Sequence, residues 1–415
     1  MTFPTPRDRV KLVHVTSALF HSYVIPRENG PMSKHKVGII GYGGFGQYLH
    51  RAWDDLNNAQ VVAVCDLQEP AKLDEKIRYF SELSHFLQDD EVKVVSLATP
   101  PKSHTEIALS AMAAGKHVLI EKPLACSEDE CRRIMKGRDE NDVVASVDYM
   151  LRFSPLVEVL CELAQSNIFG KLRRIVVENH AQDEELHRDH WFWNKDLAGS
   201  ILIEHAVHFI DISHAMTKEK LKDVCGYCHE REKGMEDRVY ASAIYDGGLM
   251  ASHYHAFARP GFFERTTQRF VFDLAEIELE GWVPLFGTIR AIVSKETKAA
   301  LSSLPNLVIN SDEHVNEVHD DSRPEGWGNI DGTQRDRTKL RSGGVEYRAQ
   351  RLISGTFQAD GKKGEVYQAS LRALMKDFLH CVDNRDHKLR VTLEDGLDSL
   401  AVACRATTKG RSLCF

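Results

Sequence analysis

The chain has 415 residues, which is too many for one ordinary hydrophobic core, so two domains are expected. Hydrophobic residues make up 42% of the chain and charged residues 27%, a composition typical of globular proteins. The net charge of −8 comes without a basic block, which argues against nucleic acid as a partner. The apolar runs, such as VVSLA at 94–98, are far shorter than the ~20 residues of a membrane helix, so no membrane partner is expected.

Residues 1–31 are predicted to be a non-catalytic extension. Their apolar patch is too short for a secretory signal, and MSKHKVGIIG, which begins at Met32, looks like a natural protein start directly before a strand. The nine cysteines are scattered and odd in number, which favours a reducing, cytoplasmic location.

A nucleotide cradle is predicted from Lys36, where KVGIIGYGGFGQYLHRAW gives an apolar strand, a glycine turn and an amphipathic helix. Gly41, Gly43 and Gly46 form the pattern GxGxxG. The first glycine permits a tight turn, the second lets the backbone approach a pyrophosphate, and the third lets the helix pack on the strand. The helix amides then face the anion.

The second strand supports this interpretation. VVAVCD at 61–66 ends in Asp66, twenty residues after the last glycine, where a Rossmann fold places the acid that binds the adenosine ribose. The next residues, Leu67 and Gln68, offer no positive charge for a 2′-phosphate, so NAD is favoured over NADP. The alternative is a carboxylate that merely ends a strand at a solvated turn.

Further strands are predicted at 92–99, 117–121 and 143–149, with a helix at 105–114 between the first two. Apolar, β-branched runs that alternate with helices indicate a parallel sheet covered on both faces. The ligand of such a sheet lies at the carboxyl ends of the strands.

Several segments together resemble the glucose-fructose oxidoreductase and inositol dehydrogenase family, Gfo/Idh/MocA. They are GYGGFG, ATPPKSHTEIALSAMAAGKHVLIEKPLA, DYMLRFSP at 148–155, AGSILIEHAVHFID at 198–211 and the closing segment 371–403. The resemblance implies a Rossmann NAD-binding domain at 32–152. It also implies a substrate-binding and oligomerisation α/β domain at 153–415, with a large, mostly antiparallel open sheet. The family context implies a homodimer or homotetramer.

Strand-like runs at 172–178, 238–245, 249–255 and 269–274 are compatible with that second domain. The polar, glycine-interrupted stretch 302–364 is predicted to form loops.

The segment AGSILIEHAVHFID raises the question of what Glu204, His205 and His208 do in an apolar run. On a helix, Glu204 and His208 are four residues apart and are neighbours. The order does not fit the zinc motif HExxH, and no metal is expected. The resemblance implies an acid/base helix, with His208 as the base and Glu204 in place of the family's aspartate, either touching substrate or orienting His208.

The resemblance also implies the other site residues. Lys122, from EKP, is expected to steady the alkoxide or share the proton, in a turn shaped by a cis proline. The cofactor-binding residues are expected to be Gly41, Gly43, Gly44, Phe45, Gly46, Asp66, Thr99, Pro100, His104, Glu121 and Lys122.

Substrate-binding residues are expected to be Lys122, Arg152, Trp191, Trp193, Asn194, His205 and His208. Aromatic faces with polar tips suit sugar rings, although either tryptophan could instead fill a domain interface. His205 either reaches a substrate hydroxyl or is a hydrogen-bonded core histidine.

The sequence therefore predicts an NAD-dependent oxidoreductase. It would act on a secondary hydroxyl of a sugar, sugar derivative or cyclitol, because alcohol oxidation needs both a hydride acceptor and a base. One alternative is a redox-neutral NAD enzyme of the same family that cleaves a glycosidic bond by oxidation, elimination and re-reduction. The other is a non-enzymatic NAD-binding regulator.

Overall fold

The computed structural model describes residues 34–318 and 336–411. The predicted extension 1–31 lies outside these ranges, and so does the middle of the stretch predicted to form loops.

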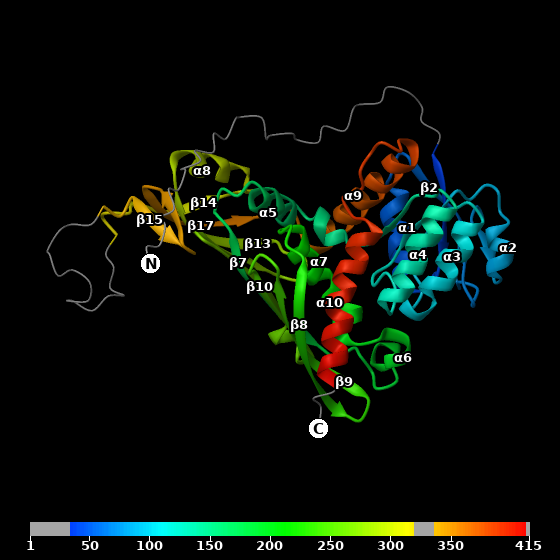
Figure 1. The fold of residues 1–415 in the computed structure, drawn as a ribbon. Coiled ribbons are helices and arrows are strands. Elements are labelled where there is room, and N and C mark those ends of the chain that lie inside the picture. Colours follow the sequence, from blue (N-terminus) through cyan, green and yellow to red (C-terminus); the bar gives the residue numbers. More distant parts are fainter. Residues whose placement is uncertain (1–33, 319–335, 412–415) are drawn as a thin grey trace, which may run out of the picture. The chain divides into compact units, whose positions relative to one another are not determined.

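The amino-terminal half, blue to cyan in Figure 1, contains a parallel sheet whose six strands have the order β3-β2-β1-β4-β5-β6. The strands are β1 (His35–Ile40), β2 (Ala59–Cys65), β3 (Arg78–Phe80), β4 (Val94–Leu97), β5 (His117–Ile120) and β6 (Ala145–Val147). The helices are α1 (Gly44–Asp54), α2 (Leu83–Leu87), α3 (His104–Ala113) and α4 (Glu128–Glu140). Strands β4 and β6 are buried along their whole length, as expected of a sheet covered on both faces. The predicted Rossmann architecture is confirmed.

The second sheet has nine strands in the order β14-β17-β13-β12-β11-β7-β10-β9-β8. They are β7 (Leu172–Gln182), β8 (Leu221–Glu232), β9 (Met235–Tyr245), β10 (Met250–Arg259), β11 (Arg265–Phe272), β12 (Ala275–Glu280), β13 (Phe286–Val293), β14 (Val308–His314) and β17 (Arg351–Gln358). Only the pair β7 and β10 is parallel, so the sheet is mostly antiparallel, as predicted.

The prediction of loops at 302–364 is wrong in part. Strands β14 and β17 lie at one edge of the large sheet, and β15 (Lys339–Ser342) and β16 (Val345–Arg348) form a separate hairpin. Strand β17 alternates buried Ile353 and Phe357 with more exposed polar neighbours. This alternation is the pattern of a half-buried strand, and it was hidden by the polar composition of the segment around it.

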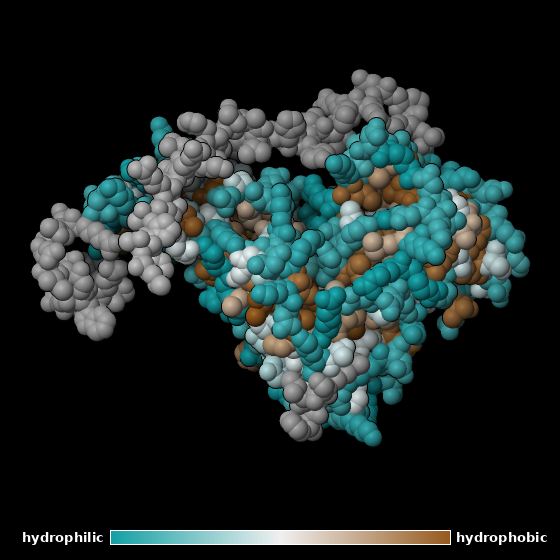
Figure 2. All heavy atoms as spheres, viewed as in Figure 1, coloured by the Kyte–Doolittle hydropathy of each residue, from teal (hydrophilic) through white to brown (hydrophobic). Residues whose placement is uncertain are grey.

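The remaining helices are α5 (Pro155–Gln165), α6 (Lys195–Ala198), α7 (Val207–Ala215), α8 (Lys295–Ala300), α9 (Lys363–Asp383) and α10 (Leu393–Arg411). Helix α10 contacts α4 of the Rossmann half as well as α7 and β8 of the other half, and α9 contacts α1 (Figure 1). Helix α10 therefore joins the two halves, and α9 packs on the Rossmann half. Polar residues cover most of the face shown in Figure 2. No described helix has the length and apolar character needed to cross a membrane.

Candidate active site

The glycine turn after β1 is built as the sequence predicts. Gly41 has φ of +89°, and a Cβ there would lie 2.6 Å from the Ala98 carbonyl oxygen. A Cβ on Gly46 would lie 2.1 Å from the Gly41 carbonyl oxygen, so helix and strand approach each other too closely for a side chain. Gly43 and Gly44 have nothing within 4 Å of a Cβ position, and no side chain caps α1. The first amides of α1 thus face open space, as an anion site requires.

Asp66 follows β2 and lies beside this turn. Its carboxylate accepts hydrogen bonds from the backbone amides of Tyr42, at 2.6 Å, and Gln68, at 3.1 Å. The backbone therefore fixes the acid at the edge of the glycine turn. Leu67 beside it is exposed and uncharged.

A cavity of about 450 Å³ begins at this turn and extends to the second half of the chain. Eleven predicted site residues line it: Gly43, Gly44, Phe45, Gly46, Thr99, Pro100, Glu121, Lys122, Trp191, Glu204 and His208. All three predicted catalytic side chains are among them. Residues of both halves of the chain thus meet in one space.

Lys122 and Glu204 form an ion pair across this cavity. The Lys122 Nζ donates to Glu204 Oε1 at 2.6 Å and to the Glu204 carbonyl oxygen at 3.0 Å. Burial is the largest single influence and disfavours the carboxylate, but the charge and hydrogen bond of Lys122, together with the nearby His205 and His190, hold the pKa of Glu204 below its usual range. Glu204 therefore holds the Lys122 amine. The two roles expected of Glu204 from the sequence, contact with substrate and orientation of His208, did not include this contact. The peptide bond between Lys122 and Pro123 is cis.

The helix that carries Glu204 is not a regular α-helix. Residues Leu202–Ala206 form a π-helical turn, and α7 starts directly after it. Single π-helical turns inside α-helices occur frequently at functional sites. Here the turn carries Glu204 and His205, while His208 lies in the first turn of α7.

His208 has the features of a neutral base. Its side chain is buried, and its Nδ1 has no hydrogen-bond partner in the described part of the chain. The ring packs edge-on against Trp282, with 5.2 Å between ring centroids. Burial, together with the nearby Lys122 and His205, lowers the pKa of His208 well below its usual range. The imidazole is therefore neutral near pH 7.

Two buried carboxyl groups lie next to Lys122. Burial raises the pKa of Glu121 well above its usual range, and the neighbouring Asp148 raises it further. Burial also raises the pKa of Asp148. Both carboxyl groups are thus harder to ionise than an ordinary carboxyl group.

A second cavity of about 220 Å³ lies beside the first, and Trp282 lines both. The Trp282 ring stacks on Tyr367, with centroids 5.6 Å apart. His205 also lines this second cavity, and its Nε2 lies 3.2 Å from the Asn179 side-chain amide. Burial lowers the pKa of His205 to about 4. His205 is thus partly hydrogen-bonded within the protein and still faces a cavity.

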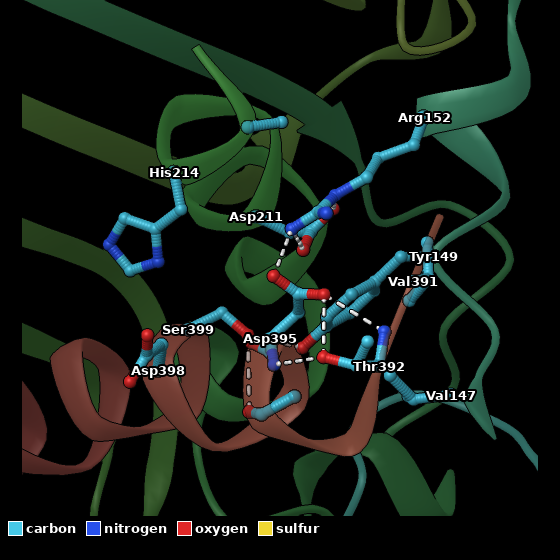
Figure 3. A network of polar contacts seen from close by, with 12 residues as sticks. Val147, Tyr149, Arg152, Asp211, His214, Val391, Thr392, Asp395, Asp398 and Ser399 are labelled. Carbon is cyan, nitrogen blue, oxygen red and sulfur yellow. Dashed lines mark hydrogen bonds and ion pairs between the residues drawn. The ribbon is translucent and has the colours of Figure 1, made fainter. Parts of the chain in front are cut away.

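Two predicted site residues instead hold the fold around the site. His104, predicted to bind the cofactor, is completely buried, and its ring nitrogens lie 2.8 Å from the carbonyl oxygens of Thr99 and Pro123. It therefore ties together the loops after β4 and β5. Arg152, predicted to bind substrate, is buried and bonded to Asp211 and Asp395, as Figure 3 shows. The Arg152 guanidinium is thus paired with two carboxylates, and Arg152 lines neither cavity.

Trp193 and Asn194 also lie outside both cavities. The Trp193 Nε1 donates to the Leu186 carbonyl oxygen at 3.1 Å, and the Arg231 guanidinium covers its ring. The Asn194 side chain caps α6. Of the two tryptophans considered for sugar stacking, only Trp191 lines the larger cavity.

Sequence reasoning missed several cavity residues: Asp148, Met150, Trp282 and Tyr367. Asp148 and Met150 lie within DYMLRFSP, the segment from which the sequence predicts only Arg152 as a site residue. Trp282 follows β12 and Tyr367 lies on α9, so only the tertiary fold brings their rings together.

The glycine turn, the fixed acid and the helix amides define a dinucleotide-binding protein of the Rossmann class. Residues 35–149 match the family model described as "Oxidoreductase family, NAD-binding Rossmann fold", and residues 157–272 match the "GFO/IDH/MocA C-terminal domain". The chain belongs to the Gfo/Idh/MocA oxidoreductase family, and its amino-terminal domain is the NAD-binding domain of that family.

Similar proteins include glucose-6-phosphate 3-dehydrogenase of Bacillus subtilis, which is 31% identical over 186 residues, covering 43% of this chain and 52% of that protein. Inositol 2-dehydrogenase of Salmonella typhimurium is 25% identical over 200 residues, covering 46% of this chain and 57% of that protein. The chain spans about half the length of the curated relatives it matches.

Solved structures share the fold over nearly the whole chain. The aldose-aldose oxidoreductase of Caulobacter crescentus has a TM-score of 0.66 at 17% identity, covering 91% of this chain and 98% of that one. The WlbA dehydrogenase of Bordetella pertussis, in complex with NADH and UDP-GlcNAcA, also has a TM-score of 0.66 at 17% identity, covering 92% and 97%.

Proposed function

We propose that the protein is an NAD-dependent oxidoreductase that transfers a hydride between nicotinamide and a secondary hydroxyl of a sugar, sugar derivative or cyclitol. The observation that carries this proposal is the convergence of Lys122, Glu204 and His208 in the cavity that begins at the glycine turn. These three residues place a buried, neutral base, His208, in the same cavity as the Lys122 ammonium group. A protein that only binds a cofactor does not need this combination.

The glycine turn, the first amides of α1 and Asp66 fit NAD. The open space at Gly43 and Gly44 accommodates a pyrophosphate against the amides of α1, and the Asp66 carboxylate can accept hydrogen bonds from ribose hydroxyls. When bound, NAD supplies the hydride acceptor. Glu121, Lys122 and Trp282 would line the end of the cavity nearest the chemistry.

Charge at the cradle sets the cofactor preference, and we expect tighter binding of NAD than of NADP. The Asp66 carboxylate repels a 2′-phosphate, and its neighbours Leu67 and Gln68 offer no compensating cation. The Asp66→Ser variant should narrow the difference between the two dissociation constants, measured by fluorescence titration. Equal affinities in the unmodified protein would contradict this assignment.

The catalytic roles follow from the geometry. His208 is a neutral base with a free Nδ1, and we assign it the hydroxyl proton of the substrate. Lys122 stabilises the developing alkoxide, because an ammonium group in a buried site acts strongly on nearby negative charge. Glu204 holds the Lys122 amine in place.

The substrate is proposed to reach from the larger cavity, where Lys122 and His208 lie, past Trp282 into the smaller cavity. Its lining combines aromatic rings with amide, hydroxyl and imidazole groups, which suits a ring with apolar C–H faces and hydroxyl edges. The dehydrogenases of inositol and of glucose 6-phosphate among the relatives support a polyol substrate.

The test is a screen of sugars, sugar derivatives and cyclitols with NAD that follows both NADH absorbance and substrate cleavage. Net NADH with intact substrate supports the oxidoreductase. Cleavage without NADH would instead identify the redox-neutral alternative, and normal NAD binding without any turnover would identify the regulator.

We further propose a homodimer or homotetramer in a reducing cytoplasm. The eight cysteines in the described ranges are all free thiols, which suits such a compartment.

A further inference from the structure

Tyr42, the second residue of the glycine turn, contacts the acid that ends β2. Its backbone amide donates to the Asp66 carboxylate at 2.6 Å. The Tyr42 side chain is buried, and Tyr42 is not among the residues that line the larger cavity. Any influence of Tyr42 on a cofactor in that cavity therefore acts through the groups that Tyr42 contacts.

Helix α1 holds the other side of Tyr42. The Tyr42 hydroxyl lies 2.5 Å from Nδ1 of His50, and the two rings are tilted with their centroids 5.7 Å apart. The Tyr42 carbonyl oxygen accepts a hydrogen bond from Gln47 Nε2 at 3.3 Å. Both partners belong to α1, whose first amides form the proposed pyrophosphate site. Tyr42 is thus bonded to the helix on one side and to Asp66 on the other.

The direction of the bond between Tyr42 and His50 is set by Asp54. His50 Nε2 lies 3.2 Å from Asp54 Oδ2, one helical turn further along α1. An ionised carboxylate only accepts hydrogen bonds, so Nε2 carries the ring hydrogen and Nδ1 accepts from the Tyr42 hydroxyl. Burial lowers the pKa of His50 in spite of the opposing effect of Asp54. Direct contacts therefore run from Asp54 through His50 and Tyr42 to Asp66.

These contacts link the two places at which a dinucleotide is held. The pyrophosphate site lies at the first amides of α1, and the ribose site lies at Asp66. Both must be placed to within about 0.5 Å for one ligand to use them together. Tyr42 bonds to α1 through its side chain and to Asp66 through its backbone. Its two hydrogen bonds therefore fix the position of one site relative to the other.

We propose that Tyr42, with His50 and Asp54 behind it, is a positioning residue that fixes Asp66 for the adenosine ribose and thereby favours NAD over NADP. This proposal rests on the proposed function. A fixed carboxylate accepts from the ribose hydroxyls of NAD without first being ordered, and it cannot turn away from a 2′-phosphate. Releasing Tyr42 from α1 therefore weakens the binding of NAD more than that of NADP.

The first test removes one hydroxyl. Tyr42→Phe keeps the ring and the backbone amide, and it should raise the dissociation constant of NAD by about 3- to 10-fold, the scale of one hydrogen bond. The dissociation constant of NADP should change less, so the preference narrows. Fluorescence titration of both cofactors measures this, and thermal melting checks folding. An unchanged ratio of the two constants would overturn the proposal.

The matched control is Tyr48→Phe. It makes the same chemical change on α1, and the Tyr48 hydroxyl has no hydrogen bond in the described part of the chain, while the phenylalanine keeps the ring contacts with Phe45 and Tyr367. Both dissociation constants should stay at their native values. A loss of preference equal to that of Tyr42→Phe would show that the bond to His50 is not the cause.

A pair of substitutions at His50 tests the bond from its other side. His50→Asn places an amide oxygen close to the position of Nδ1, so it can still accept from the Tyr42 hydroxyl, whereas His50→Leu cannot. Both variants lose the contact with Asp54, so their difference isolates the bond to Tyr42. His50→Leu should resemble Tyr42→Phe, and His50→Asn should keep most of the preference for NAD. Equal preferences in the two folded variants would overturn the proposal.

A double-substitution cycle tests whether Tyr42 acts through Asp66. Asp66→Ala removes the carboxylate, so adding Tyr42→Phe to it should not change the ratio of the two dissociation constants any further. A further change of the same size as in the unmodified background would mean that Tyr42 acts by another route.

The last test uses the unliganded protein. The backbone amide of residue 42 should exchange its hydrogen faster in Tyr42→Phe and in His50→Leu than in the unmodified protein or in Tyr48→Phe. Native exchange in both variants would overturn the proposal. An unmodified protein that binds neither dinucleotide is a different outcome, because it overturns the proposed function and the cofactor preference together, while the exchange rates still report whether the hydroxyl holds the turn.

Discussion

Lys122, which pairs with Glu204 in the larger cavity, is expected to contribute to turnover and not to cofactor binding. Lys122→Ala removes the group that stabilises the alkoxide, and kcat should fall by ~10²-fold or more. NAD binding should change little, because the cradle is formed by backbone amides. Steady-state kinetics and a cofactor titration check this, with exposed Lys102→Ala as the control. Near-normal turnover would show that Lys122 does not stabilise the alkoxide.

The pH profile should report His208. A base must be deprotonated to act, so kcat/KM should rise with pH through the pKa of His208. Because the surroundings of His208 lower its pKa, this rising limb of the pH profile should lie below ~6.5. Glu204→Gln leaves the charge of Lys122 uncompensated, which should move the rising limb to still lower pH.

The substitutions at the two histidines discriminate between their roles. His208→Ala should remove the limb and most of the rate, whereas His205→Ala should leave some activity. A rising limb that persists in His208→Ala would assign the base to another group.

At the scale of elements, the glycine turn gives a matched pair of substitutions. Gly46→Ala places a methyl group 2.1 Å from a backbone oxygen, so α1 must move and the protein should lose stability. Gly43→Ala meets no atom within 4 Å, so folding should be unaffected, but the methyl group occupies the space proposed for the pyrophosphate.

Thermal melting and NAD titration distinguish the two variants. Gly43→Ala should melt like the unmodified protein and bind NAD more weakly, while Gly46→Ala should melt at a lower temperature. Native NAD affinity in Gly43→Ala would place the pyrophosphate elsewhere.

The elements of the Rossmann half could be predicted because each carries a local pattern. Glycines at fixed spacing identify the turn, and apolar runs identify β4, β5 and β6. The π-helical turn at Leu202–Ala206 could not be predicted, because a one-residue shift in backbone hydrogen bonding has no residue signature. The contact between Trp282 and Tyr367 depends on how distant segments pack. Glu204 and Lys122 are 82 positions apart in the sequence, so their ion pair is visible only in three dimensions.

For the whole molecule, the buried neutral histidines predict sensitivity to acid. The folded state holds the pKa of His253 at about 3 and those of His205 and His214 at about 4, below the value of ~6.5 in an unfolded chain. Between these values the unfolded state binds more protons, so the free energy of unfolding should fall as pH decreases below ~6.5.

Urea unfolding between pH 7 and pH 5 measures this dependence. His253→Gln removes one such group and should make the decline shallower. A free energy of unfolding that stays constant over that range would show that these buried histidines are not neutral in the folded protein.

The contacts of α10 and of the segment just before it have a consequence for synthesis. They supply hydrogen-bond partners for residues about 250 positions earlier in the chain. The Ser399 hydroxyl is the partner of the Tyr149 hydroxyl, and the Val391 carbonyl oxygen accepts from the Ser146 hydroxyl. Asp395 likewise completes the ion network of Arg152. On the ribosome, the Rossmann half can form its strands early, but these buried polar groups wait for their partners until the end of translation. A chain that stops before Val391 therefore lacks these partners for Ser146 and Tyr149, and it leaves Arg152 with Asp211 as its one carboxylate partner among those named here.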